Sequence, residues 1–142
     1  MIESATAHDW PKIRSLLERV DLPLAGIDEH LPTMLVAKDG EQIVGTAGLE
    51  LYAEGALLRS VAVDPELQGK HVGHRLTEAA LRLAASRGAA TVFLLTTTAE
   101  RFFPKFGFEP VTRDEVPASV RASVEFQSAC PASAIVMRKR LR

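Results

Sequence analysis

The chain has 142 residues, of which 46% are hydrophobic and 25% are charged, and its formal net charge is −1. This length and composition suit one compact globular domain, so we expect a single domain over residues 1–142. The near-neutral charge argues against a nucleic-acid partner, and the single cysteine, Cys130, excludes an intramolecular disulfide and provides no metal-ligand spacing.

We expect no signal peptide at the N-terminus. Residues 1–4 lack the basic region and apolar stretch that a signal peptide needs. No apolar run approaches the roughly 20 residues that cross a bilayer. We therefore expect a cytoplasmic protein with no membrane partner.

A helical stripe then predicts the first helix, formed by Trp10, Ile13, Leu17 and Val20. Thr6 and His8 are the candidate caps, and Pro11 favours the later start because its missing N–H does no harm in the first turn. The helix ends before Pro23. Residues 23–32 form a loop or a short second helix, in which His30 is expected at the surface.

Strand signals follow. Three antiparallel strands over residues 34–37, 42–51 and 56–63 are predicted to form a meander, joined by an Asp39-Gly40 turn and a turn at Gly55.

The second half of the chain alternates between helices and strands. A long helix is expected from Gly69–Gly73 to Arg87, followed by a strand over residues 91–96 that lies parallel to the third meander strand. A shorter helix over residues 99–106 and a last strand over residues 133–137 complete the pattern. The order of elements predicts one α/β domain with a mixed sheet.

Residues 61–74 carry the strongest functional signal, because a strand ends there in a glycine-bearing loop that opens into the long helix. Helix N-termini have unpaired N–H groups and partial positive charge, and glycine lets the backbone approach a ligand. A pyrophosphate pocket is one interpretation, with Lys70 and His74 as added cationic or polar groups. A tight turn that needs glycine for steric reasons is the other. The spacing is neither that of a Walker loop nor that of a Rossmann loop.

The run Gln68-Gly69-Lys70-His71-Val72-Gly73 resembles the acetyl-CoA-binding motif of the GNAT acetyltransferases, Gln/Arg-x-x-Gly-x-Gly/Ala. Residues 99–108, which end in a Gly-Phe pair, resemble a second mark of that family. The resemblance implies a GNAT fold: a mixed six- to seven-stranded sheet with an antiparallel meander, a central splayed parallel pair and about four helices. Two residues depart from the pattern, since His71 replaces a usual glycine and Phe103 replaces a tyrosine that protonates the leaving thiolate.

Residues 57–60, 94–100 and 125–134 further resemble the arsenic-resistance N-acetyltransferases within this family. The resemblance implies transfer of an acetyl group from acetyl-CoA to the amine of a small, anionic amino acid such as arsinothricin or phosphinothricin. A non-catalytic acetyl-CoA sensor and a protein or peptide acetyltransferase stay open as alternatives. Dimers are common in the family, so a homodimer is also an expectation.

The same resemblance assigns the acetyl-CoA contacts. The backbone of Val61 and Val63 would pair with the pantetheine chain, and Phe103 would form a wall. Thr97 and Thr98, at the end of the parallel strand, would bond to the cofactor or cap the next helix, and capping is the role expected for Thr98. The pyrophosphate would lie at the start of the long helix, on Gln68, Gly69, Lys70, His71, Val72, Gly73 and His74.

Two carboxylates are candidates to accept the proton of the amine. An ammonium cannot attack, so a carboxylate in a partly dry cleft is chemically suited, and Glu50 and Glu125 are predicted for this role. The alternatives are a solvent-facing strand residue for Glu50 and a helix cap or surface charge for Glu125.

Arg59 is predicted to bind a carboxylate or oxyacid of the substrate. Strand alternation places it on one face with Leu57, Val61 and Val63. Its guanidinium suits bidentate capture of an anion, and an ion pair with Glu50 or Glu125 is the alternative. Arg113, expected on the strand after the Gly-Phe pair, is a second candidate cation.

Overall fold

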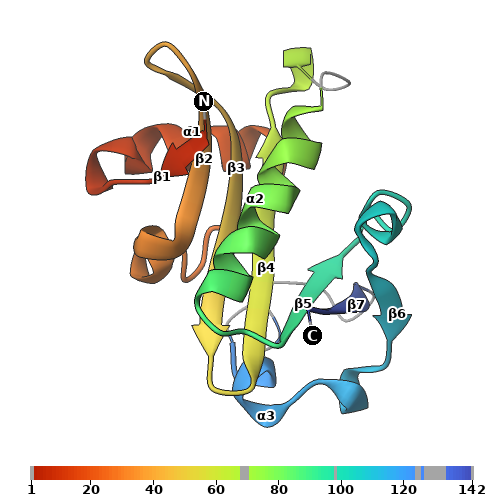
Figure 1. The fold of residues 1–142 in the computed structure, drawn as a ribbon. Helices are drawn as coiled ribbons and strands as arrows, with labels where there is room; N and C mark the ends of the chain where they lie inside the picture. Colours follow the sequence, from red (N-terminus) through yellow and green to blue (C-terminus); the bar gives the residue numbers. More distant parts are fainter. Residues whose placement is uncertain (1, 68–70, 98, 124–125, 127–133, 142) are drawn as a thin grey trace.

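The computed structural model describes residues 2–67, 71–97, 99–123, 126 and 134–141 (Figure 1). Within these ranges the strands make one seven-stranded sheet in the order β1-β2-β3-β4-β5-β7-β6. The strands are β1 (Ile2–Ser4), β2 (Met34–Asp39), β3 (Gln42–Tyr52), β4 (Gly55–Val63), β5 (Thr91–Thr96), β6 (Glu109–Val111) and β7 (Ile135–Arg140). The predicted α/β fold with a meander and a central parallel pair is confirmed, since β2, β3 and β4 are antiparallel neighbours and β4 is parallel to β5.

The described residues contain three α-helices, α1 (Trp10–Arg19), α2 (Val72–Ser86) and α3 (Ala118–Arg121), rather than about four. Short 3₁₀ helices supply the other helical turns, at Ala7–Asp9, Asp28–Thr33, Pro65–Leu67, Phe103–Phe106 and Arg113–Glu115. Pro11 lies in the first turn of α1, as predicted. No helix in these described ranges is long and apolar enough to span a membrane.

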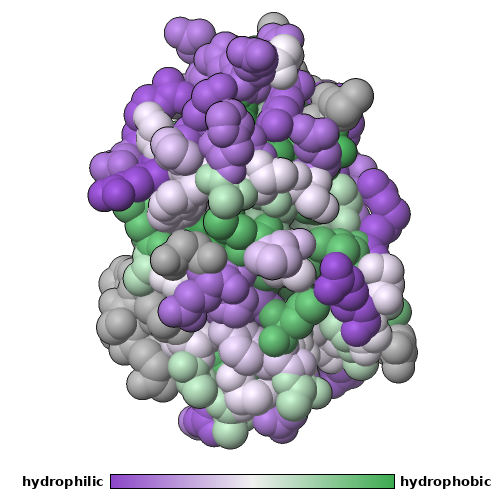
Figure 2. Space-filling view, turned by 90° about the vertical axis from the view of Figure 1, so that its left-hand side faces the viewer, coloured by the Kyte–Doolittle hydropathy of each residue, from purple (hydrophilic) through white to green (hydrophobic). Residues whose placement is uncertain are grey.

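The two longer helices cover opposite faces of the sheet (Figure 1). On one face α2 buries Leu76, Ala80 and Ala84 against the meander. On the other face α1 buries Ile13, Leu16 and Leu17. Apolar side chains also reach the surface across the middle of the face that Figure 2 shows, which is the left-hand side of Figure 1.

Gly45 allows α2 to lie close to β3. A Cβ at Gly45 would lie 2.7 Å from Leu76 Cδ1 and 3.2 Å from the Ala62 carbonyl oxygen, so an alanine there requires the buried Leu76 side chain or the helix to shift. We expect Gly45→Ala to lower the free energy of unfolding by about 1–3 kcal/mol, the usual cost of overpacking a core. Thermal unfolding measures this, and a Tm equal to that of the wild type would contradict it.

The parallel pair separates soon after it begins. Only Ala56 with Val92 and Leu57 with Phe93 are paired between β4 and β5. The cause is a bulge in β4, where Ser60 has φ +59° and the register against β3 shifts by one residue. The predicted splayed pair is therefore present, and the bulge produces it.

The same bulge overturns the predicted placement of Arg59. An extra residue in a strand reverses which side chains share a face beyond it. Val61 and Val63 pack with Leu58 on the α2 side, whereas Ala62 packs on the α1 side. Arg59, two residues from Leu57, thus faces away from Val61, and the prediction that they share a face was wrong.

The helix predicted over residues 99–106 is also wrong in its extent. A turn precedes a 3₁₀ helix of four residues, Phe103–Phe106. Pro104 has no N–H to donate to the carbonyl four residues earlier, which prevents an α-helix there. Gly107, with φ +93°, ends the segment.

Two boundaries differ in the last part of the chain. β6 ends at Val111, so Arg113 starts a 3₁₀ helix instead of lying on a strand. Thr112 caps that helix, and its N–H donates to Glu115 Oε2 at 2.9 Å. The last strand runs from Ile135 to Arg140 and is longer than predicted.

Candidate active site

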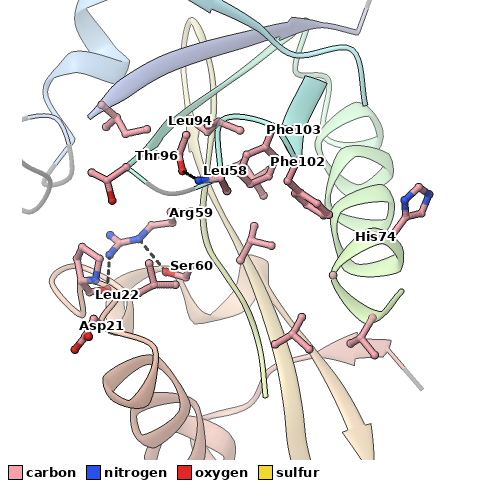
Figure 3. A pocket seen from close by; sticks show the side chains of 18 of the residues that line it. Asp21, Leu22, Leu58, Arg59, Ser60, His74, Leu94, Thr96, Phe102 and Phe103 are labelled. Carbon is pink, nitrogen blue, oxygen red and sulfur yellow. Dashed lines mark hydrogen bonds between the residues drawn. The ribbon is translucent and has the colours of Figure 1, made fainter. Parts of the chain in front are cut away.

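A cavity of about 1200 Å³ passes between the separated strands (Figure 3). At one end it is lined by the N-terminus of α2, and at the other by residues 21–23, which follow α1. β4 lines it from Leu58 to Val63 and β5 from Leu94 to Thr96. Because α1 and α2 lie on opposite faces of the sheet, the cavity joins the two faces.

The inner wall of the cavity is a strand edge. Beyond Leu57 and Phe93, no ladder pair joins β4 to β5 within the described ranges. The backbone groups of β4 from Arg59 to Val63 therefore have no β5 partner, and such an edge can pair with an extended chain. Val61 and Val63 both line this stretch.

The N-terminus of α2 closes one end of the cavity with Val72, Gly73 and His74. A helix of 15 residues carries partial positive charge and unpaired N–H groups there. A Cβ at Gly73 would lie 3.3 Å from Val63 Cγ2, so glycine permits close packing of α2 on β4. This end suits an anion. The predicted contacts Gln68, Gly69 and Lys70 lie outside the described residues.

The backbone conformation at His71 explains why the GNAT motif usually has glycine at this position. It precedes α2 with φ +64°, in the left-handed region that glycine adopts without strain. Its side chain is exposed, and its ring lies 6.2 Å from that of His74. The His74 ring packs on Phe106 at 4.8 Å, and its Nε2 lies 3.3 Å from Glu78 Oε1.

An aromatic group forms the wall beside α2. Phe103 is buried, lines the cavity, and packs against Phe102 and Phe108 at ring distances of 5.1 and 5.8 Å. Thr97 also lines the cavity. Thr98, for which a capping role was predicted, lies outside the described residues. Thr96, which the sequence did not single out, makes a contact of this kind: its Oγ1 accepts a hydrogen bond from Ala99 N at 2.9 Å.

Glu50 and Arg59 form a buried ion pair. Arg59 Nη1 lies 2.9 Å from Glu50 Oε2, and the two side chains are 2% and 1% exposed. The solvent-facing alternative for Glu50 is therefore wrong. Arg59 lines the cavity, whereas Glu50 does not.

Arg59 also anchors the segment after α1. Its Nη1 donates to the Ala25 carbonyl at 2.6 Å, its Nη2 to the Pro23 carbonyl at 3.1 Å, and its Nε to Ser60 Oγ at 3.3 Å. A guanidinium with these partners would have to give several of them up to bind a substrate anion in bidentate fashion. The structure therefore brings Glu50 and Arg59 together as a joint between β3, the bulge and the α1 segment.

Two further side chains complete the cluster around Glu50. Tyr52 donates its hydroxyl proton to the Glu50 carboxylate, and burial together with this bond raises the pKa of Tyr52 far above its usual range. His30 Nε2 lies 3.8 Å from Glu50 Oε1, and its side chain is 30% exposed. The prediction that His30 lies at the surface is thus only partly right. Nothing in the sequence indicated that Glu50 would be its neighbour.

The other predicted charges lie elsewhere. Arg113 does not line the cavity, and its guanidinium lies 5.7 Å from the Phe126 ring. Glu125 and Cys130 lie outside the described residues. In the described part of the chain, no three His, Cys, Asp or Glu side chains gather as a metal site requires.

Asp64 fixes the start of the loop that leads to α2. It is buried, its Oδ1 accepts the Glu66 N–H at 3.0 Å, and its Oδ2 accepts Arg19 Nη2 at 3.2 Å. The Glu66 N–H, aided by Arg19, lowers the pKa of Asp64 below its ordinary 3.8. This residue was not singled out from the sequence, although Asp-Pro marks the end of the strand.

The lowered pKa of Asp64 predicts an acid-sensitive contribution to stability. A carboxyl whose pKa is depressed by folding stabilises the fold above its unfolded pKa, and this stabilisation is lost as pH falls through the folded pKa. Between roughly pH 5 and pH 3, Asp64→Asn should therefore lose less Tm than the wild type. Asp39→Asn, an exposed position, is the control and should follow the wild type. Parallel pH curves for Asp64→Asn and wild type would contradict this.

The cavity as a whole suits a long ligand that has an anionic group at one end and amide groups along an extended chain, and comparisons with known proteins agree. The family model of the acetyltransferase (GNAT) domain matches residues 30–110. An amino-acid acetyltransferase of Mycobacterium tuberculosis is 28% identical over 130 residues, 84% of this chain and 74% of that protein. One from Ralstonia nicotianae is 32% identical over 131 residues, 91% of this chain but 26% of that protein.

Solved structures share the fold. N-acetylglutamate synthase from Neisseria gonorrhoeae, complexed with coenzyme A and N-acetyl-glutamate, superposes with a TM-score of 0.86 at 23% identity. The match covers 100% of this chain and 35% of that chain. The fold, the cavity and the family match define an acyltransferase that uses acetyl-CoA. The chain belongs to the GNAT acetyltransferase family.

Proposed function

We propose that this protein acetylates the α-amine of a small anionic amino acid, either glutamate or an analogue whose side chain ends in an arsinic or phosphinic acid. The observation that carries the proposal is the cavity that runs from the N-terminus of α2, which suits an anion, to residues 21–23 after α1. The relatives named as amino-acid acetyltransferases support an amino-acid acceptor. The arsenical analogue rests on the resemblance of residues 57–60 and 94–100.

The residues that line the cavity fit acetyl-CoA. The pyrophosphate suits the N-terminus of α2, where His71, Val72, Gly73 and His74 lie. The pantetheine amides suit the edge of β4 at Val61 and Val63, which has the unpaired backbone that they require. Phe103 offers an apolar surface beside this path.

The reaction is a direct transfer. Acetyl-CoA supplies the acetyl group as a thioester. The neutral amine forms a C–N bond with the thioester carbon, the C–S bond breaks, CoA leaves as a thiolate, and the nitrogen releases one proton. N–H groups on the edge of β4 polarise the thioester carbonyl. Phe103 has no hydroxyl, so the thiolate takes its proton from water or from the adduct.

Glu50 and Arg59 act in this scheme as positioning residues. Their buried pair holds the bulge of β4 and the segment after α1, which together shape the acceptor end of the cavity. Glu125, the other candidate that the sequence offers for the proton of the amine, is proposed as the proton acceptor.

Thiol release from acetyl-CoA tests the proposal. The purified protein is incubated with L-glutamate, a phosphinic acid analogue of glutamate, and a peptide with a free N-terminal alanine. Faster release with the first two than with the peptide or buffer supports the proposal. Release with the peptide alone would indicate a peptide acetyltransferase, and CoA binding without release would indicate a sensor.

A cytoplasmic location and a homodimer stay predictions from the sequence. Light scattering of the purified protein tests the second of these, with a mass of two chains as the expected result.

A further inference from the structure

Three non-glycine residues have positive φ within the described ranges, and all three line the same cavity. They are Asp21 (φ +57°), Ser60 (φ +59°) and His71 (φ +64°). Side chains are strained in this region of backbone conformation, and such strain gathers at functional sites. Ser60 forms the bulge and His71 precedes α2. Asp21 is left without a role in the fold that would require its carboxylate.

Glycine at position 21 would adopt the observed backbone conformation with less strain than aspartate. The Leu22 N–H donates to the Leu17 carbonyl at 3.0 Å, and the Asp21 N–H donates to the Glu18 carbonyl at 3.3 Å. This is the Schellman ending of a helix, in which the residue with positive φ is usually glycine. Both bonds use only the backbone, so the ending of α1 does not depend on the side chain of Asp21.

The carboxylate of Asp21 is exposed at the end of the cavity that lies away from α2. It has no hydrogen-bond or ion-pair partner among the residues that the structure describes. Arg59 also lines the cavity (Figure 3), but its guanidinium is engaged with Glu50 and with the carbonyls of Pro23 and Ala25.

Apart from Arg59, whose charge is paired with Glu50, the charged side chains that line the cavity differ between its two ends. The α2 end has the helix N-terminus with His71, His74 and Lys105, whereas Asp21 is the carboxylate that lines the cavity within the described ranges. An acceptor enters as an ammonium, because amines of amino acids are protonated at neutral pH. A carboxylate at the acceptor end attracts this group and lowers the affinity for acceptors that lack it.

We infer that Asp21 is a specificity-determining residue that binds the ammonium group of the acceptor by charge pairing. This inference rests on the proposed function, since it assigns the acceptor end of the same cavity. It also gives the strained backbone at this position a reason, because glycine would relieve the strain and remove the charge.

Asp21→Asn is the principal test, since asparagine keeps the shape and tolerates positive φ. The KM for L-glutamate should rise about tenfold, as expected for loss of a charge-assisted contact of about 1.4 kcal/mol. The KM for acetyl-CoA should stay within about twofold, because the α2 end is unchanged. Asp39→Asn removes an exposed charge outside the cavity and should match the wild type in both constants.

Binding to the CoA complex provides a readout that does not need turnover. Calorimetry compares L-glutamate with 2-hydroxyglutarate, in which a hydroxyl replaces the ammonium. Wild type should prefer glutamate, and Asp21→Asn should bind the two more nearly alike. Asp21→Gly should lose the same preference while its Tm stays at or above that of the wild type.

The outcomes distinguish the inference on Asp21 from the proposed function. Acetylation by wild type with an unchanged glutamate KM and preference in Asp21→Asn would overturn the inference and leave the proposed function intact. Glutamate binding that depends on Asp21 without any acetylation would support the inference and overturn the proposed function. A fall in Tm in Asp21→Gly, with no change in preference, would make Asp21 a structural residue.

Discussion

Replacing Arg59 by methionine should lower the free energy of unfolding by about 3–5 kcal/mol, the usual cost of leaving a buried charge without its partner. Glu50 is 1% exposed, and Arg59 is the cation that neutralises it at 2.9 Å. The Pro23 and Ala25 carbonyls would also lose their donor. Urea unfolding at neutral pH measures the effect.

The double variant Glu50→Leu with Arg59→Met separates charge from loop anchoring. Two apolar side chains in place of a buried pair are often close to neutral for stability, so the double variant should recover much of the lost free energy. It should not recover the KM for the acceptor, because the segment after α1 stays unanchored. The KM for acetyl-CoA should change little in either variant. A double variant as unstable as Arg59→Met would show that the loop contacts, not the charges, dominate.

The sequence predicted the elements with strong local signals. The Asp39-Gly40 turn and the Gly-Phe pair at Gly107 each carry backbone conformations that glycine favours, so their positions agree with the structure. The helix over residues 99–106 was predicted too long because the prediction did not take Pro104 into account. In that segment the missing N–H determined the structure.

The bulge at Ser60 was beyond reach from the sequence. Serine has no strong preference for positive φ, so nothing local marks the residue. The prediction therefore assumed that side chains alternate between the two faces of the strand through Ser60 as well. The prediction therefore placed Arg59 on the same face as Val61, which is wrong. An ion pair of Arg59 with Glu50 was one of the predicted alternatives. The structure shows how it forms, because across the turn at Gly55 Glu50 pairs with Leu57, two residues before Arg59.

The side chains at the cavity could not be placed from the sequence for a different reason. In the sequence Asp21 is an ordinary helix terminator, and only the structure reveals that its φ is positive and that it lines the same cavity as Ser60 and His71. His30 approaches Glu50 from a 3₁₀ helix with a kink at His30, which no sequence pattern indicates. Residues that meet through loops of irregular backbone are those for which periodicity carries no information.

Replacing Ser60 by valine should close the cavity and reduce kcat/KM about a hundredfold, because a β-branched residue rarely adopts positive φ and the strands would shift by more than the reaction geometry tolerates. The free energy of unfolding should fall by about 2 kcal/mol, in line with strain at one residue. Ser60 is buried, and its carbonyl accepts Thr46 Oγ1 at 2.7 Å, so the bulge is held from β3 as well.

Ser60→Gly is the matched control for this prediction. It loses the same hydroxyl, which accepts Arg59 Nε at 3.3 Å, but it adopts positive φ without strain. Its Tm and its kcat/KM should stay much closer to those of the wild type than the valine variant does. Equal losses in the two variants would assign the role to the hydroxyl, and would mean that the bulge conformation is not what opens β4 to acetyl-CoA. A large loss in valine alone ties the activity to the left-handed residue that separates β4 from β5.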